Sequence, residues 1–113
     1  MSEGILVARI GDIEEGEGLQ VDAAVLGTVD NVAVFNDDGE YFALDDTCTH
    51  ETASLAEGWV EDGCVECPLH AAKFCLSSGE VQSMPATIDA QVHRVLISGD
   101  EIRVIPNPER LAR

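Results

Sequence analysis

Two short motifs, each pairing a cysteine with a histidine, constrain this chain more than any other feature. The motifs are Cys48-Thr-His50 and Cys67-Pro-Leu-His70, and sixteen residues separate them. Each offers one thiolate and one imidazole, which are ligands of zinc and of iron–sulfur centres. A fold that uses both motifs at one site must bring two separate loops face to face.

Most of the chain is patterned as short apolar strands separated by turn signals. Asn36-Asp37-Asp38-Gly39 and Glu61-Asp62-Gly63 are typical hairpin turns. Thr52 to Glu57 can form one helical turn with Ser54 as its cap, and 106–113 has no periodic pattern. The expected strands are 4–10, 19–25, 31–36, 41–44, 59–60, 64–66, 73–76, 91–97 and 101–105. This pattern predicts a single all-β domain, residues 1–113, built as an antiparallel sandwich or barrel.

The expected hairpins also place the two motifs. The hairpin over residues 32–44 leads into Cys48, and the hairpin around Asp62 leads into Cys67. Each cysteine–histidine pair therefore lies in a loop at the end of a hairpin. A rigid sheet that presents two short loops towards each other would hold a metal centre at fixed spacing.

The charge balance is strongly acidic and excludes some partners. The chain has 22 acidic and 6 basic residues, a formal net charge of -16, and no Lys or Arg lies between Arg9 and Lys73. Repulsion excludes nucleic acid and anionic membrane surfaces. A negative field around the motifs would instead steer the protein towards basic docking surfaces.

The sequence predicts a cytoplasmic protein with reduced thiols, because it shows neither a membrane-spanning stretch nor an export signal. Cys64 and Cys67 form a C-x-x-C pair, which leaves a redox dithiol or half a zinc site as alternatives. Cys64 and Cys75 are otherwise expected to be small buried apolar side chains. His93, which has no ligand partner nearby in sequence, is expected to be an ordinary satisfied histidine.

The two motifs and their surroundings resemble the Rieske proteins, and within them the small ferredoxins of bacterial aromatic-ring-hydroxylating dioxygenases. The resemblance rests on CTHE, SLAEG, VECPLH, FCLSSG and Met84-Pro85-Ala86. It implies one [2Fe-2S] cluster with Cys48 and Cys67 on one iron and His50 and His70 on the other. It also implies a Rieske-like fold with a small cluster-binding subdomain inserted at about residues 45–85.

The same resemblance implies an electron carrier and not an enzyme in its own right. A flavin-dependent ferredoxin reductase would be its donor, the terminal Rieske oxygenase its acceptor, and the carrier itself a monomer. The CPLHAAKF sequence departs from the CPYHGW of oxygenase catalytic subunits, which favours the free ferredoxin. The sequence does not name the aromatic substrate.

The resemblance further implies a low reduction potential. High-potential members carry an extra cysteine in each loop, where this chain has Ala53 and Leu69. They also place a Ser and a Tyr after the second motif, where Ala72 and Phe74 stand here. Fewer hydrogen bonds to sulfur disfavour the reduced state, so we expect a value near the low end of roughly -150 to +300 mV.

Two alternatives stay open at this point. Two cysteines and two histidines also suit tetrahedral zinc in an interaction module, although zinc modules more often use C-x-x-C and H-x-x-x-H pairs. The second alternative is a small Rieske-like subunit of a nitrite reductase; many such subunits lack the ligands, whereas this chain keeps all four. Iron content and acid-labile sulfide would exclude zinc.

Overall fold

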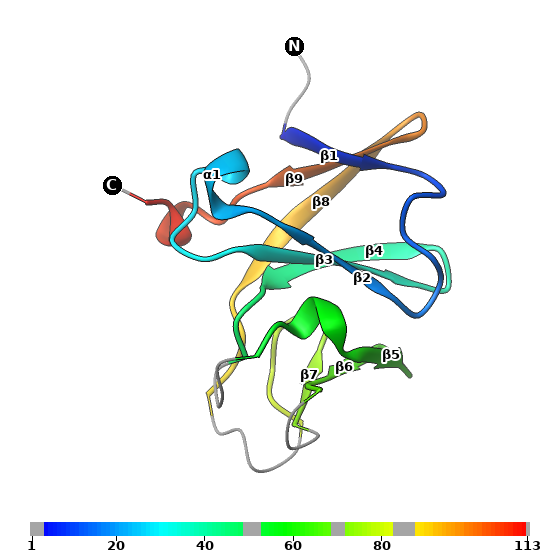
Figure 1. Ribbon diagram of the computed structural model, residues 1–113, viewed down its shortest axis with the longest axis vertical. Helices are drawn as coiled ribbons and strands as arrows, with labels where there is room; N and C mark the ends of the chain where they lie inside the picture. Colours follow the sequence, from blue (N-terminus) through cyan, green and yellow to red (C-terminus); the bar gives the residue numbers. More distant parts are fainter. Residues whose placement is uncertain (1–3, 49–52, 69–71, 83–87, 113) are drawn as a thin grey trace.

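The computed structural model describes residues 4–48, 53–68, 72–82 and 88–112, which form two antiparallel sheets. The larger sheet has six strands in the order β1-β9-β8-β4-β3-β2, and the smaller has the order β5-β6-β7 (Figure 1). The strands are β1 Ile5–Arg9, β2 Gly18–Val21, β3 Val32–Asp37, β4 Glu40–Asp45, β5 Trp59–Glu61, β6 Cys64–Glu66, β7 Lys73–Cys75, β8 Val92–Ser98 and β9 Glu101–Ile105. The short helices are α1 Ala23–Leu26, η1 Leu55–Glu57 and η2 Pro108–Arg110. The expected all-β class is confirmed.

Strand β3 lies between two hydrophobic cores, which explains its unbroken apolar run. Val32 and Val34 face one core, whereas Ala33 and Phe35 face the other, and all four are fully buried. The large-sheet core comprises Ala8, Ile13, Val21, Leu26, Val32, Val34, Ala43, Ile102 and Val104. The second, which we call the site core, comprises Ala33, Phe35, Leu44, Cys48, Leu55, Val65, Cys67, Ala72, Phe74, Leu76 and Ala90.

Two Asp-Gly turns make the hairpins that organise both sheets. Asp38 has φ 52° and Gly39 has φ 88°, and Asp62 and Gly63 have φ 54° and 77°. Positive φ at both central residues is the twist that two-residue hairpins require. The β3–β4 and β5–β6 hairpins predicted at these turns are therefore confirmed.

The small sheet is an insertion between two neighbouring strands of the large one. Strand β4 pairs with β8 at Ala43–His93 and Leu44–Val92, yet β5, β6 and β7 lie between them in sequence. The chain thus leaves the large sheet after Asp45, builds the small sheet, and returns at Val92. Figure 1 shows the small sheet at the lower end of the molecule, remote from the N-terminus.

Three local expectations need correction. The strand expected over 19–25 ends at Val21, and a short helix follows, capped by the Asp22 carboxylate at Ala24 N (2.8 Å). Ser54 precedes η1 but makes no side-chain cap, because its hydroxyl is engaged elsewhere. The C-terminal stretch, which showed no pattern, forms η2 through a Pro at its first turn and the Asn107 side chain. None of the helices in the described ranges is long and apolar enough to cross a bilayer.

Candidate metal centre

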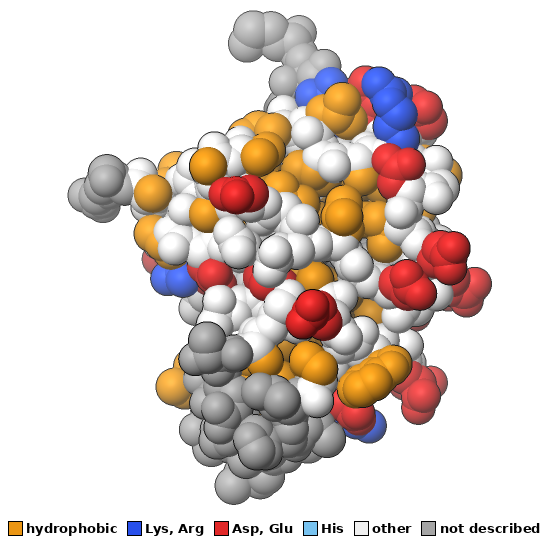
Figure 2. All heavy atoms as spheres, viewed as in Figure 1, with side chains coloured by type: hydrophobic (Ala, Val, Ile, Leu, Met, Phe, Trp, Pro, Cys, Tyr) orange, Lys and Arg blue, Asp and Glu red, His pale blue; other side chains and the backbone are white. Residues whose placement is uncertain are grey.

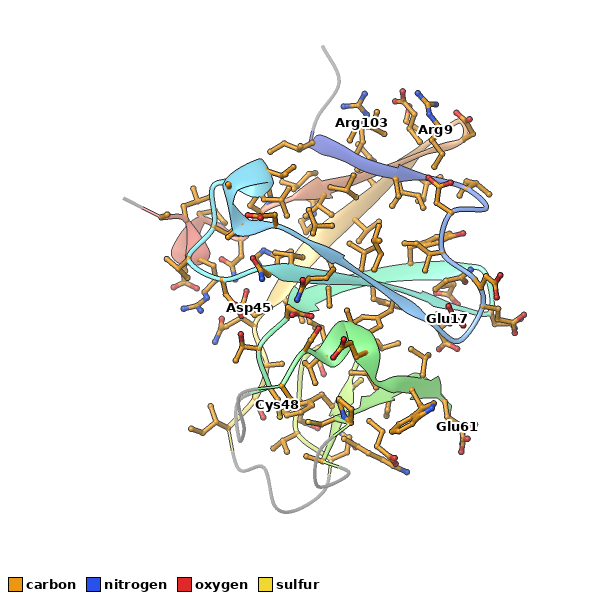
Figure 3. The ribbon with its side chains drawn as sticks, in the orientation of Figure 1. Arg9, Glu17, Asp45, Cys48, Glu61 and Arg103 are labelled. Carbon is orange, nitrogen blue, oxygen red and sulfur yellow. The ribbon has the colours of Figure 1, made fainter. Side chains whose placement is uncertain are left out.

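The two motif cysteines lie at one end of the molecule. Cys48 follows β4, Cys67 follows β6, and both belong to the site core. Their exposed fractions are 4% and 0%. Figure 3 shows Cys48 at the small-sheet end, below Asp45. Each cysteine thus follows a hairpin, as predicted, and the structure adds that both thiols border one hydrophobic core.

The same backbone hydrogen bond closes both motif loops. Cys48 N donates to Ala53 O at 2.9 Å, and Cys67 N donates to Ala72 O at 2.7 Å. In each case the acceptor lies five residues after the cysteine. The two loops therefore have matching bases, although one motif is C-x-H and the other is C-x-x-H.

A buried carboxylate, Asp46, ties both ends of the first loop to the large sheet. Its Oδ1 accepts from Ser54 Oγ (2.8 Å) and Ala56 N (3.0 Å), and its Oδ2 accepts from Gln20 Nε2 (2.6 Å). Its backbone carbonyl accepts from Leu55 N at 2.7 Å. Asp46 thus connects the segment before Cys48 with the segment after Ala53. Through Gln20 it also connects both segments with β2.

A second carboxylate holds the residue next to Cys48. Asp30 accepts from Thr47 N (2.9 Å) and from Thr47 Oγ1 (2.8 Å). Thr47 also forms a β-bridge with Ser54 across the base of the loop. Of the two residues before Cys48, Asp46 is therefore held through its own buried carboxylate, and Thr47 is held by the half-buried carboxylate of Asp30.

A third carboxylate, Asp45, anchors the C-terminal stretch beside the same segment. Its Oδ1 lies 2.7 Å from His93 Nε2, and Arg110 contacts its Oδ2 through Nε (2.8 Å) and through the guanidinium NH2 nitrogen (2.6 Å). Asn107 N donates to His93 Nδ1 at 2.9 Å. Because Nδ1 accepts, the proton lies on Nε2 and the imidazole is the neutral donor to Asp45. His93 is a satisfied structural residue, as expected.

A close backbone approach brings η1 against β6 beside the second loop. A Cβ placed on Gly58 would lie 2.0 Å from the Glu66 carbonyl oxygen, one residue before Cys67. Gly58 has ordinary φ of -83°, so sterics and not conformation require glycine here. Ala72 and Phe74, on the other side of the loop, are fully buried.

Half of the predicted ligand set lies outside the described residues. His50 and His70 fall there, as do Leu69 and Met84-Pro85-Ala86. Within the described ranges, no three His, Cys, Asp or Glu side chains are grouped closely enough to hold a metal ion. The structure thus places the two thiols, and the four-residue ligand set stays a prediction.

Charge is unevenly spread around this end of the molecule. In the view of Figure 2 acidic side chains gather along the right-hand edge and are scattered over the rest of the face, whereas Arg9 and Arg103 lie at the far end from Cys48 (Figure 3). Arg9 is paired with Asp100 (3.1 Å), and Arg103 with Glu101 (2.8 Å). These cations are therefore partly neutralised as well as remote from the site.

The expectation that Cys64 and Cys75 are buried is wrong. Both are half-exposed and lie directly opposite each other on β6 and β7. Val65 and Phe74, one step along the strands, fill the site core, so the two cysteines point to the other face of the small sheet. In the sequence, apolar residues alternate with these two positions. This alternation could have indicated that Cys64 and Cys75 face away from the core.

Comparison with known proteins agrees with the geometry. The family model of the Rieske [2Fe-2S] domain matches residues 3–106. The 3-phenylpropionate/cinnamic acid dioxygenase ferredoxin subunit of Escherichia coli (strain K12) is 40% identical over 99 residues, covering 87% of this chain and 89% of that protein.

Two solved structures are also similar. The ferredoxin of carbazole 1,9a-dioxygenase from Nocardioides aromaticivorans IC177 superposes with a TM-score of 0.84 at 29% identity, covering 94% of this chain and 100% of that one. A ferredoxin in a complex of reduced oxygenase and oxidized ferredoxin in carbazole 1,9a-dioxygenase gives a TM-score of 0.80 at 30% identity, covering 88% and 99%.

Proposed function

Because this chain belongs to the Rieske [2Fe-2S] family, we propose that Cys48, His50, Cys67 and His70 hold one such cluster. The matching hydrogen bonds Cys48 N–Ala53 O and Cys67 N–Ala72 O carry the proposal, since they close the bases of both motif loops beside one core. Two thiols and two imidazoles are the donor set of a Rieske cluster. When bound, the cluster accepts and releases one electron at a time.

The protein is an electron-transfer ferredoxin of an aromatic dioxygenase system and acts as a carrier. Its own residues position the cluster: Asp46 and Asp30 fix the chain before and after the first loop, and β6 and β7 fix the second. The neutral imidazoles of the donor set remove negative charge from one iron relative to four thiolates, which raises the potential above that of plant-type ferredoxins.

The terminal oxygenase of such a system is the electron acceptor in this proposal, and a flavin-dependent reductase is the donor. The carbazole 1,9a-dioxygenase ferredoxin, 30% identical to this chain, forms a complex with its oxygenase. The acidic charge of -16 supports docking on basic surfaces of both partners. The cytoplasmic location and monomeric state stay predictions.

The buried environment of the second loop supports a low potential within the Rieske range. Ala72 and Phe74 are fully buried beside Cys67 and carry no side-chain donor. Ala53, at the base of the first loop, carries no thiol for a disulfide with the second. With fewer donors to sulfur, the reduced state is less stabilised, and we expect a midpoint well below about +100 mV.

The comparisons favour neither the zinc-binding module nor the nitrite reductase subunit. The family match and the 40% identity to a dioxygenase ferredoxin subunit favour an iron–sulfur cluster over zinc and the dioxygenase system over nitrite reduction. A zinc module would bind metal without sulfide. A nitrite reductase subunit would accept electrons in a complex with that enzyme and would not reduce an aromatic-ring oxygenase.

The ligand set is tested by substituting each of the four residues in the holoprotein and measuring the electron paramagnetic resonance of the reduced form. Cys48→Ser and Cys67→Ser should abolish or shift the Rieske signal, and His50→Ala and His70→Ala should lose it. The chain offers matched controls: Cys64→Ser and Cys75→Ser for the thiols. Both should keep the wild-type spectrum, because these side chains face away from the site core.

Two results would contradict the proposal. The first is a wild-type spectrum in Cys67→Ser, and the second is equal loss of signal in Cys64→Ser. A redox titration of the wild type gives the potential, and a midpoint above about +100 mV would contradict the low-potential assignment. Reduction of a purified aromatic-ring oxygenase by the prereduced protein tests the acceptor.

A further inference from the structure

Cys64 and Cys75 are two further thiols, separate from the proposed cluster ligands. We propose that this pair is a cross-strand dithiol that closes to a disulfide by exchange with a small-molecule disulfide. The two residues are Cα partners in the β6–β7 ladder, and both carry free thiols. The side chains of directly opposite residues point to the same face of a sheet.

The hydrogen bonds of the ladder identify the pair as one whose usual spacing a disulfide can bridge. Leu76 N donates to Gly63 O (2.9 Å) and Cys67 N donates to Ala72 O (2.7 Å), and bonded pairs alternate along an antiparallel ladder. The Cys64–Cys75 step is therefore a non-hydrogen-bonded pair. The Cα atoms of such pairs lie about 4.5 Å apart, within the roughly 4.4 to 6.8 Å that disulfides bridge.

The backbone of Cys75 confirms this assignment. Its N–H donates to Glu80 O (2.8 Å), and its carbonyl accepts from Gly79 N (2.7 Å). Both groups therefore bond to the segment after β7 and not to β6. The peptide groups of Cys75 need not move when the side chains join, because none of their hydrogen bonds crosses between the two strands.

The two thiols have unequal acidity, which suits them to attacking and resolving roles. Hydrogen bonds with the Ser77 and Ser78 hydroxyls lower the pKa of Cys75 to about 7. Burial, followed by the neighbouring Cys75, raises the pKa of Cys64. A thiol whose pKa lies near the ambient pH is the best attacker in exchange. The other charged groups near the pair are Lys73, Asp62, Asp37 and Glu61.

The thiol–disulfide exchange proceeds in two steps. The Cys75 thiolate attacks one sulfur of the small disulfide, forming a mixed disulfide and expelling one thiolate. Cys64, after losing its proton to solvent, attacks Cys75 Sγ, forms the intramolecular bond and expels the second thiolate. The protein loses two electrons and two thiol hydrogens, and the small disulfide becomes two thiols. The product links β6 to β7, the two strands that flank the second motif loop.

The test equilibrates the anaerobic holoprotein with buffers of hydroxyethyl disulfide and mercaptoethanol, which are uncharged and so unaffected by the net charge of -16. Thiols are trapped with acid and alkylated, and peptides are mapped by mass spectrometry. Cleavage after Lys73 separates Cys75 from the other cysteines, and cleavage after Glu66 separates Cys64 from Cys67. We expect a Cys64–Cys75 cross-link that rises with the disulfide ratio while the visible spectrum of the cluster is unchanged.

Two variants assign the roles. Cys64→Ser should stop at a mixed disulfide on Cys75, and Cys75→Ser should react about fivefold more slowly at pH 7 because only the less acidic thiol remains. The proposal is overturned by the absence of the cross-link at every ratio that leaves the cluster intact, or by cross-links that use Cys48 or Cys67 instead. Unchanged reactivity in Cys75→Ser would also overturn it. Failure of the cluster assignment would show separately, as a spectrum that does not depend on Cys48 or Cys67.

Discussion

Replacing Asp46 with alanine should destabilise the protein more than any change to its exposed neighbours. The carboxylate is 2% exposed and accepts hydrogen bonds from Ser54, Ala56 and Gln20. Hydrogen bonds to a charged group are worth roughly 1.5 to 3 kcal/mol each. The bond from exposed Gln20 is discounted to about 0.5 kcal/mol by competition with water. With values near the lower end of that range for the part-buried bonds from Ser54 and Ala56, the sum is about 4 kcal/mol for Asp46→Ala.

Asp46→Asn is the matched control, because it keeps the shape and one oxygen acceptor. That oxygen can still accept from Ser54 and Ala56, and the new amide can donate to Gln20 once the Gln20 amide has flipped. Loss of the charge should then cost only about 1 kcal/mol. Gln20→Ala, which removes the exposed partner alone, should cost about 0.5 kcal/mol.

Urea unfolding of the holoprotein measures the difference, followed by far-ultraviolet circular dichroism and by the visible absorbance of the cluster. With a slope of about 2 kcal/mol/M, Asp46→Ala should lower the midpoint by about 2 M and Asp46→Asn by about 0.5 M. The visible signal should be lost with or before the far-ultraviolet signal in Asp46→Ala, because the first loop is released. Equal midpoints for the two variants would refute the hydrogen-bond account.

Three further outcomes are expected. Gly58→Ala should lower stability by about 2 kcal/mol, measured by urea midpoint, because its Cβ would overlap a β6 carbonyl oxygen; an unchanged midpoint would contradict the close approach. Arg110→Met should cost about 1 to 2 kcal/mol, discounted for the partial exposure of the guanidinium, because it removes both guanidinium donors from Asp45; no loss would mean that the C-terminal contact contributes nothing. Alkylation of Cys75 should rise with pH and be half-maximal near pH 7, and Ser77→Ala should move that midpoint upwards; an unmoved midpoint would contradict the role of this hydroxyl.

Much of the fold was predictable because its signals are local. Asp38-Gly39 and Asp62-Gly63 favour positive φ and so specify two hairpins from a few residues. The alternation of Val32, Ala33, Val34 and Phe35 was also visible, and the structure assigns the two sets to different cores. Helix α1 was missed although Asp22 and Gly27 are ordinary cap residues, since four residues give too short a period to detect.

The supporting network of the site could not be predicted in the same way. In a chain with 22 acidic residues, nothing distinguishes Asp45, Asp46 or Asp30 from the solvated ones. Their partners are distant in sequence: Gln20 is 26 residues from Asp46, and Arg110 is 65 residues from Asp45. Only folding brings these groups together and buries them, and burial is what makes their hydrogen bonds important to stability.

The sequence by itself determines the chemistry of the site, because the types of ligand residue and the spacing between them do not depend on the conformation of the chain. Cys48, His50, Cys67 and His70 could therefore be singled out, and the family recognised, without coordinates. Which face of the small sheet is covered is a different matter. Val65 and Phe74 are buried while Cys64 and Cys75 meet on the open side, because one face of β6 and β7 packs into the site core, to which β3 also contributes. Long-range packing decides exposure, and exposure decides whether a thiol is inert or reactive.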